Sequence, residues 1–293
     1  MADFSTPWEL LNNSDAITMY IDRVIQKSLE YETVFTQMAD MNALGRNDEN
    51  SPADFIFQYI EKTSKGFTVT ETRPGALAEQ SIDAYEIKSG EIKIYSGQIQ
   101  TPYELSKMQK WNIKQDMLND MAEQAALDFD ASLGVFLTSN VTDVAETNSG
   151  AFTFPDDILK LKKAVYQAHK RQPDVLYIGT NIEDKLLKLD NFIEASKYGS
   201  NTPLLNGEIG KLYGLRIVST PYLDQGGIDG SSPTNDTMLC LRMTAKPLRV
   251  EYWQPLYRFY EWYDNPRHVY INELRAFYKA RLFDATAIRQ MKI

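Results

Sequence analysis

The sequence has a single cysteine, Cys240, and only two histidines, His169 and His268, among 293 residues. One cysteine excludes an internal disulfide, which indicates a protein of a reducing compartment. Cys240 stands in the apolar run 238–241, so we expect a small buried strand residue and not a catalytic thiol. Neither histidine has another His or Cys at a metal-ligand spacing, and we therefore expect no metal site.

Long apolar runs and excess positive charge are also missing. No stretch approaches the roughly 20 apolar residues of a membrane span, so no membrane partner is expected. The chain begins Met-Ala-Asp-Phe, without the basic and apolar regions of a signal peptide. The formal net charge of -9 argues against a general nucleic-acid binder, because phosphate contacts need clustered Lys and Arg.

The familiar motifs of catalysis are absent as well. There is no Gly-x-Ser-x-Gly elbow and no Walker loop. The glycines of 207–214 lack the spacing of a dinucleotide site, and a strand follows them, so turns are expected. Asp224, Asp229 and Asp236 lack the spacing of a calcium loop, so a solvated loop is expected. We predict no catalytic, cofactor-binding or metal-binding residues, no cofactor and no enzyme.

Three other groups of residues have a functional and a structural interpretation. Asp128 and Asp130 are two residues apart, so one helix face does not carry both. A basic stripe could contact nucleic acid, but a solvated face is favoured for Lys107, Lys110 and Lys114. Aromatic side chains near the C-terminus could stack on bases. Core or subunit-interface packing is favoured for Trp253, Tyr257, Tyr260, Trp262 and Tyr263.

The first hundred residues combine one helical pattern with alternating strands. Apolar residues at helical spacing over 17–29 predict an amphipathic helix. Alternation predicts strands near 55–59 and 67–69. Two alternating runs flank Ser89-Gly90 and predict a polar β-hairpin over 85–95. Because an isolated hairpin is only marginally stable in water, we expect this arm to find its partner on another chain.

The period becomes helical at Pro102. Apolar residues recur every three to five positions up to Phe136, which predicts a helix of about 45 Å that begins at Pro102 and ends near Gly134. Its narrow apolar stripe is typical of a helix that lies across a sheet. A second helix is predicted to open at Pro155-Asp156-Asp157, where acidic residues suit the positive N-terminal end.

Short apolar strands alternate with helices in the next region. Strands are predicted over 174–179, 215–219 and 237–243, with a helix over 181–189. This alternation indicates a compact α/β unit over about 150–245. The tail then has a clear period of two: one strand face carries Leu274, Ala276, Tyr278, Ala280 and Leu282, and the other carries Arg275, Phe277, Lys279, Arg281 and Phe283.

This order of parts resembles the major capsid proteins of tailed bacteriophages and related viruses, whose Johnson fold encapsulins share. Residues 92–105 look like the family's passage from its E-loop into its spine helix. Residues 174–180 with Leu186-Leu187 are similar to its A-domain strand and helix, and residues 210–223 to its turn-strand motif. The resemblance covers nearly the whole chain.

The resemblance implies an α+β fold with an N-arm, an E-loop hairpin, a long spine helix, a P-domain sheet and an inserted α/β A-domain. The implied divisions are an N-terminal arm and helix at 1–45, the lead into the P-domain at 46–65, the E-loop at 66–100, the spine helix at 101–150, the A-domain at 151–245 and the P-domain return strands at 246–293.

The resemblance also implies a function. Copies would assemble through hexamers and pentamers into an icosahedral shell around double-stranded DNA, without sequence-specific binding. The 225–236 loop would point to the ring centre and the 66–100 hairpin would lie over a neighbour. Expected partners are a portal and scaffold or decoration proteins, and the expected location is the virion, with assembly in the host cytoplasm. One alternative is an encapsulin-type shell around a cargo enzyme; another is an α/β hydrolase, which the missing catalytic constellation disfavours.

Overall fold

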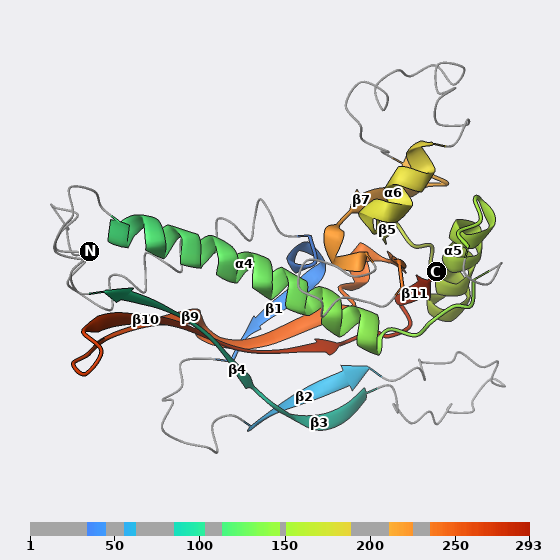
Figure 1. Ribbon diagram of the computed structural model, residues 1–293. Coiled ribbons are helices and arrows are strands. Elements are labelled where there is room, and N and C mark those ends of the chain that lie inside the picture. The colour runs from blue at the N-terminus through green and yellow to red at the C-terminus, as the bar shows by residue number, and fades with distance from the viewer. Residues whose placement is uncertain are drawn as a thin grey trace, which may run out of the picture.

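The computed structural model describes residues 34–44, 56–62, 85–102, 113–146, 151–188, 211–224 and 235–293. These residues form an α+β structure with two main sheets, a separate two-stranded ribbon and one long helix (Figure 1). The helix predicted over 17–29, the strand near 67–69 and most of the 225–236 loop lie outside them. Within the described stretches, no helix combines the length and apolarity that a bilayer crossing requires.

The first sheet has the strand order β1-β9-β10-β4. The short β1 (Ala39–Ala43) lies parallel to β9 (Leu248–Asp264). The long β10 (Val269–Leu282) runs antiparallel to β9 on one side and to β4 (Lys93–Pro102) on the other. The predicted alternation of the tail is confirmed, since Leu274, Ala276 and Tyr278 are all buried on one face of β10.

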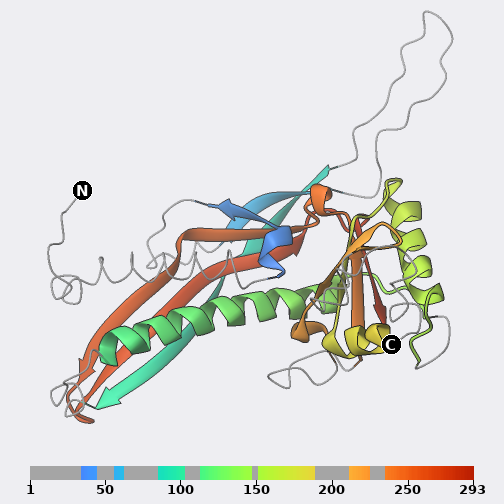
Figure 2. The same ribbon diagram turned by 90° about the horizontal axis from the view of Figure 1, so that it is seen from above.

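The long helix α4 (Ile113–Asn140) lies across this sheet, as predicted (Figure 2). Its 28 residues correspond to a length of about 42 Å. Leu118, Ala122 and Phe129 are buried in the core that α4 shares with β9 and β10. The prediction that the helix begins at Pro102 is wrong, because Pro102 pairs with Val269 at the end of β4.

Gly134 does not end the helix; it lies inside α4, six residues before its last residue. The side chain of Phe35 occupies the space beside it, and a Cβ added to Gly134 would lie 2.8 Å from Phe35 Cε2. Phe35 leads into the 3₁₀ turn η1 (Thr36–Met38) just before β1. The glycine therefore serves the close approach of two segments about a hundred residues apart.

A Gly134→Ala variant should be less stable than the native protein by about 1 kcal/mol. The strain against the fully buried Phe35 ring, about 1–3 kcal/mol, exceeds the roughly 1 kcal/mol that alanine contributes to a helix interior. Urea denaturation measures the difference. Gly97→Ala is the matched control, since a Cβ there meets nothing within 4 Å and stability should hardly change. A more stable Gly134→Ala variant would mean that the Phe35 ring moves freely.

The predicted hairpin over 85–95 is wrong in its pairing. Strand β3 (Tyr85–Glu91) pairs antiparallel with β2 (Ile56–Lys62), and Ser89-Gly90 lie inside β3 instead of forming a turn. Strand β4 follows at once but joins the first sheet. Ile92, between them, is buried with Phe277 and Trp253, which anchors the point where the chain leaves the ribbon for the sheet.

The second sheet has the order β11-β8-β5-β7-β6. Its strands are β5 (Val175–Ile178), β6 (Lys211–Leu212), β7 (Leu215–Ser219), β8 (Thr237–Leu241) and β11 (Ile288–Lys292). Strands β5 and β7 are parallel and the other pairs are antiparallel. Tyr213 and Gly214, both with positive φ, form the turn between β6 and β7, which confirms the predicted role of that glycine.

Two helices cover one face of this sheet (Figure 1). As predicted, α5 (Asp156–His169) buries Ile158, Leu161 and Val165, and α6 (Thr180–Leu187) begins directly after β5. The short 3₁₀ turns η4 (Pro221–Leu223) and η5 (Met243–Ala245) follow β7 and β8. The opposite sheet face joins the core of the first sheet through Tyr177 and Leu239.

The last strand ties the two sheets together. Although β9 and β10 return to the first sheet, β11 pairs with β8 in the second. The buried amide of Gln290 in β11 donates to the carbonyls of Thr138 and Val141 at 3.0 and 2.7 Å. These carbonyls stand at the C-terminal end of α4, where a helix has no partners of its own for them. The end of α4 is therefore held against the second sheet.

Candidate assembly interface

Strand β4 forms one edge of the first sheet. Among the described residues it pairs with β10 alone, over ten residue pairs from Lys93 to Pro102. The side chains from Lys93 to Gln98 are exposed, with Ile94 at 51% and Tyr95 at 42%, whereas Thr101 near the end of the strand is buried. A long exposed edge with apolar side chains is a template for pairing with another chain.

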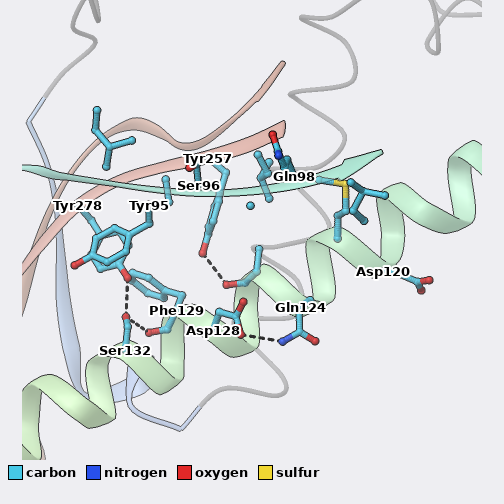
Figure 3. A pocket seen from close by; sticks show the side chains of 17 residues that line it. Tyr95, Ser96, Gln98, Asp120, Gln124, Asp128, Phe129, Ser132, Tyr257 and Tyr278 are labelled. Atoms are coloured by element: carbon cyan, nitrogen blue, oxygen red, sulfur yellow. Dashed lines mark hydrogen bonds between the residues drawn. The ribbon is translucent and has the colours of Figure 1, made fainter. Parts of the chain in front are cut away.

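A groove of about 650 Å³ lies between this edge and α4 (Figure 3). Its floor is largely apolar and includes Met121, Ala125, Phe129 and Leu274. Polar side chains of α4 stand at the rim: Asp120, Gln124 and Asp128, of which Gln124 donates to Asp128 at 2.8 Å. The groove therefore offers apolar surface beside an acidic helix.

Aromatic contacts hold one wall of the groove in place. The rings of Tyr95 and Tyr278 stack with centroids 4.4 Å apart, and Phe129 meets Tyr278 edge-on at 4.7 Å. The Tyr278 hydroxyl lies 2.6 Å from Ser132 Oγ (Figure 3). Tyr257 donates to the carbonyl of Ala125 at 2.9 Å. These contacts join β4, β10, β9 and α4 across the groove.

These tyrosines are suited to structure and not to proton transfer. Burial raises the pKa of Tyr95, against a smaller opposing effect of its bond with Tyr278. Burial likewise raises the pKa of Tyr278 and of Tyr257. A group whose pKa lies further above neutrality is a poorer general acid or base near pH 7. The wall is therefore a neutral, packed surface.

The β2–β3 ribbon is a second exposed surface. Its two described strands pair with each other and with no strand of either main sheet. Ile87 on β3 has 75% of its side chain exposed, the largest exposure of any large hydrophobic residue among those described. The strand predicted at residues 85–88 is therefore part of β3, although it pairs with β2 and not with the segment after Gly90.

Cys240 is the buried strand residue that the sequence predicted, and His169 contacts two polar side chains. Cys240 is fully buried in β8, and burial raises the pKa of its thiol. His169 Nδ1 lies 3.3 Å from Thr286 Oγ1 and 3.6 Å from Asp284 Oδ2. Because both contacts meet the same ring nitrogen, these residues do not form a nucleophile relay.

The remaining histidine has no ligand-like surroundings either. His268 lies in the turn between β9 and β10, and its Nδ1 is 2.9 Å from the hydroxyl of Tyr263. Among the described residues, no three His, Cys, Asp or Glu side chains come together as a metal site.

Asp224 and Asp236 are structural and not solvated as the sequence suggested. Both are buried, at 8% exposure. Asp224 accepts from the Asn181 backbone N–H at 3.0 Å and from the Thr180 hydroxyl, and so caps the N-terminus of α6. Asp236 accepts from the side chains of Asn181 and Lys185. Asp229 lies outside the described residues.

Asp128 and Asp130 point to different surroundings, as their spacing predicts. Asp128 is exposed at the groove, whereas Asp130 is buried and accepts from the backbone N–H groups of Val34, Phe35 and Thr36. Burial raises the pKa of Asp130, although these hydrogen bonds oppose the effect. No sequence signal linked this carboxylate to residues nearly a hundred positions away.

Two of the five aromatic residues of the tail lie in the core, which confirms the predicted core packing for Trp253 and Tyr257 and leaves interface packing of the others a prediction. Trp253 is buried and stacks on Phe277 at 5.3 Å, and Tyr257 is buried against α4. Tyr260 lies beneath the guanidinium of Arg275 at 4.8 Å. Trp262 remains 41% exposed near the end of β9. Lys107 and Lys110 and the side chain of Lys114 lie outside the described parts of the chain.

The likeness of this chain to known proteins lies in its structure. No protein-family model matches the sequence, and no curated protein matches it. Solved structures do match. The structure titled Mycobacterium phage Che8 is 16% identical with a TM-score of 0.60, over 89% of this chain and 91% of that one.

The chain has the fold of phage capsids. The capsid of a native GTA particle is 13% identical with a TM-score of 0.61, over 89% of this chain and 93% of that one. A virus-like particle from Pyrococcus furiosus is 10% identical with a TM-score of 0.56, over 94% and 99%. The capsid fold thus spans nearly the whole chain, which confirms the fold class that the order of sequence parts predicted.

Proposed function

We propose that this protein is the structural subunit of a closed shell, the major capsid protein of a tailed phage or related virus, and not an enzyme. The observation that carries the proposal is the capsid fold over 89% of the chain. The exposed β4 edge and the β2–β3 ribbon support it, since a subunit that assembles needs surfaces that only another chain covers.

Hexamers and pentamers would tile the shell around double-stranded DNA. In this proposal the first sheet with α4 is the P-domain, the second sheet the A-domain, and the ribbon the base of the E-loop. These assignments differ in part from the divisions predicted from the sequence, because β11 lies in the range 246–293 but pairs in the second sheet, and β2 lies in the range 46–65. A net charge of -9 is consistent with a shell that does not bind the packaged DNA tightly. A portal and scaffold or decoration proteins would be partners, the virion the location, and the host cytoplasm the place of assembly.

An encapsulin-type shell around a cargo protein is the second candidate. The likeness to the virus-like particle from Pyrococcus furiosus, at a TM-score of 0.56, supports it. The content of particles separates the two proposals. Particles isolated from the native source should contain double-stranded DNA under the first proposal, and a co-purifying enzyme without genome-length DNA under the second.

Negative-stain microscopy of the purified protein, together with light scattering after size exclusion, tests the shell itself. Closed particles, or rings of five or six subunits, are expected. A protein that stays a monomer or small dimer in every salt and crowding condition overturns the shell proposal.

Shortening the ribbon should abolish particles without unfolding the subunit. Gln58 and Ser89 are directly opposite in the β2–β3 pair, so an Asn-Gly turn can replace residues 59–88 and close the hairpin. The buried contact of Ile92 with Phe277 is retained. Circular dichroism should show a native melting transition, and microscopy should show no shells.

A matched control removes exposed apolar surface elsewhere. Leu159 on α5 is 41% exposed on the second sheet's helix layer, and Leu159→Ser should leave both folding and assembly intact. Full shells from the shortened chain would show that the ribbon is not part of the assembly contact.

A further inference from the structure

The residues at the free edge of β4 carry no charge after the first position. Lys93 opens the strand, and the nine residues from Ile94 to Pro102 contain no Asp, Glu, Lys or Arg. Proteins usually protect a long edge strand with inward charges, prolines or bulges. The only proline of β4 is its last residue, so the strand has little protection against pairing.

The sequence of this edge is complementary to itself around Gly97. In an antiparallel pair of two β4 strands centred there, Gly97 faces Gly97 of the second copy, and Tyr95 faces Ile99. Aromatic and β-branched residues form favourable cross-strand pairs. A Cβ at Gly97 would meet nothing within 4 Å, so the sheet face at this position has room for a side chain.

Charge favours the same register. In this register Lys93 of the second copy faces Thr101 of the first. Lys93 lies on the same face of β4 as Tyr95 and Thr101. That face is the α4 side of the sheet, because Tyr95 stacks on Tyr278 and Thr101 contacts Met117 of α4. That side carries the acidic rim of the groove, where Asp120 is exposed. A basic residue of one copy thus arrives beside an acidic helix of the other.

We propose that two copies of this chain pair through antiparallel β4 edges centred on Gly97, which continues the first sheet across a two-fold axis. The added strand would cover the open side of the groove beside α4 with Tyr95, Gly97 and Ile99 of the second copy. Such a contact is isologous, so it closes on itself and can join two rings that heterologous contacts have already formed. The pairing does not depend on the shell proposal, since a dimer alone would show it.

A single engineered cysteine tests the register. In Gly97→Cys, two copies of residue 97 face each other at about 4.5–5.5 Å between Cα atoms, within the range that a disulfide spans. The native Cys240 is buried and should not compete. Mild oxidation of the full-length protein, soluble or assembled, should give a disulfide-linked dimer on a non-reducing gel.

Gln100→Cys is the matched control on the same exposed strand. In the proposed register Gln100 faces Ile94, so two copies of residue 100 are about 20 Å apart along the strand. It should give at least about tenfold less crosslinked dimer than Gly97→Cys, since a disulfide cannot bridge that distance. Equal yields from the two variants, or no dimer from Gly97→Cys, overturn the proposal.

A charge exchange gives an independent test. Ser96 and Gln98 are exposed, and each faces the other across the proposed axis. In the Gly97→Cys background, Ser96→Lys with Gln98→Lys places like charges opposite each other and should lower the crosslink yield about fivefold. Ser96→Lys with Gln98→Glu places opposite charges together and should restore it.

The two proposals fail in different ways. A Lys–Glu variant that crosslinks as weakly as the Lys–Lys variant overturns the two-fold register. Shells that form without any crosslink at residue 97 leave the shell proposal standing and overturn only this pairing. Crosslinked dimers from a protein that never forms particles support the pairing and contradict the shell.

Discussion

An Asp130→Ala variant should lose about 3 kcal/mol of its free energy of unfolding. The carboxylate is 1% exposed and receives four hydrogen bonds from the segment before β1. Phe35 N–H and Thr36 N–H reach Oδ1 at 2.9 and 3.0 Å, and Val34 N–H reaches Oδ2 at 3.0 Å. Alanine leaves these donors without acceptors, and each buried unsatisfied donor costs about 1–3 kcal/mol.

Urea denaturation followed by circular dichroism measures this loss. Asp128→Ala is the matched control on the same helix, because Asp128 is exposed and accepts a hydrogen bond from the exposed Gln124 (Figure 3). It should shift stability by less than about 0.5 kcal/mol. The same segment carries Phe35, whose ring packs against Tyr177 in the core, so its release would also loosen this core contact. Equal midpoints for Asp130→Ala and the native protein would show that the segment is not anchored by this carboxylate.

A Glu251→Leu variant should be destabilised more strongly, by about 4 kcal/mol. Arg281 of β10 donates to Glu251 Oε1 of β9 at 2.6 Å, and the side chains are only 8% and 1% exposed. Removing the carboxylate takes the Glu251 charge away from the buried guanidinium, and breaking such a buried pair costs about 3–5 kcal/mol. Thermal and urea unfolding both measure the effect.

The double variant Glu251→Leu with Arg281→Met distinguishes the lost pair from a packing defect. An apolar replacement of both charges is often neutral or stabilising, so the double variant should regain most of the lost stability. Asn42, which also donates to Glu251, is exposed and can bond to water instead. A double variant as unstable as the single one would show that shape, and not charge, sets the cost.

Local sequence patterns were sufficient to predict those helices and strands whose own residues encode them. The apolar spacing of α5 and the short apolar runs of β5, β7 and β8 predicted real elements, because a helix face or a buried strand is encoded by its own period. Gly214 was correctly predicted to allow a turn, since its φ of 81° suits glycine.

Pairings between distant segments could not be predicted in the same way. The alternating runs around Ser89-Gly90 suggested a hairpin, yet β3 pairs with β2 and β4 with β10. Alternation states which face a side chain takes, and it says nothing of which strand lies alongside. The sequence placed Gly134 near the end of the long helix but could not show why a glycine is needed there, because the ring that requires it belongs to Phe35, far away in the sequence.

The candidate interface also has features that the sequence shows and features that only the tertiary structure shows. The sequence by itself determined the absence of a cysteine pair, of catalytic motifs and of excess positive charge, together with the periods of the long helix and the tail. Only the tertiary structure decided that β4 is an edge, that a groove opens beside α4, and that Asp130 and Gln290 hold distant segments in place. Composition and period are properties of neighbouring residues, whereas edges, grooves and buried hydrogen bonds exist only once segments far apart in the chain have packed together.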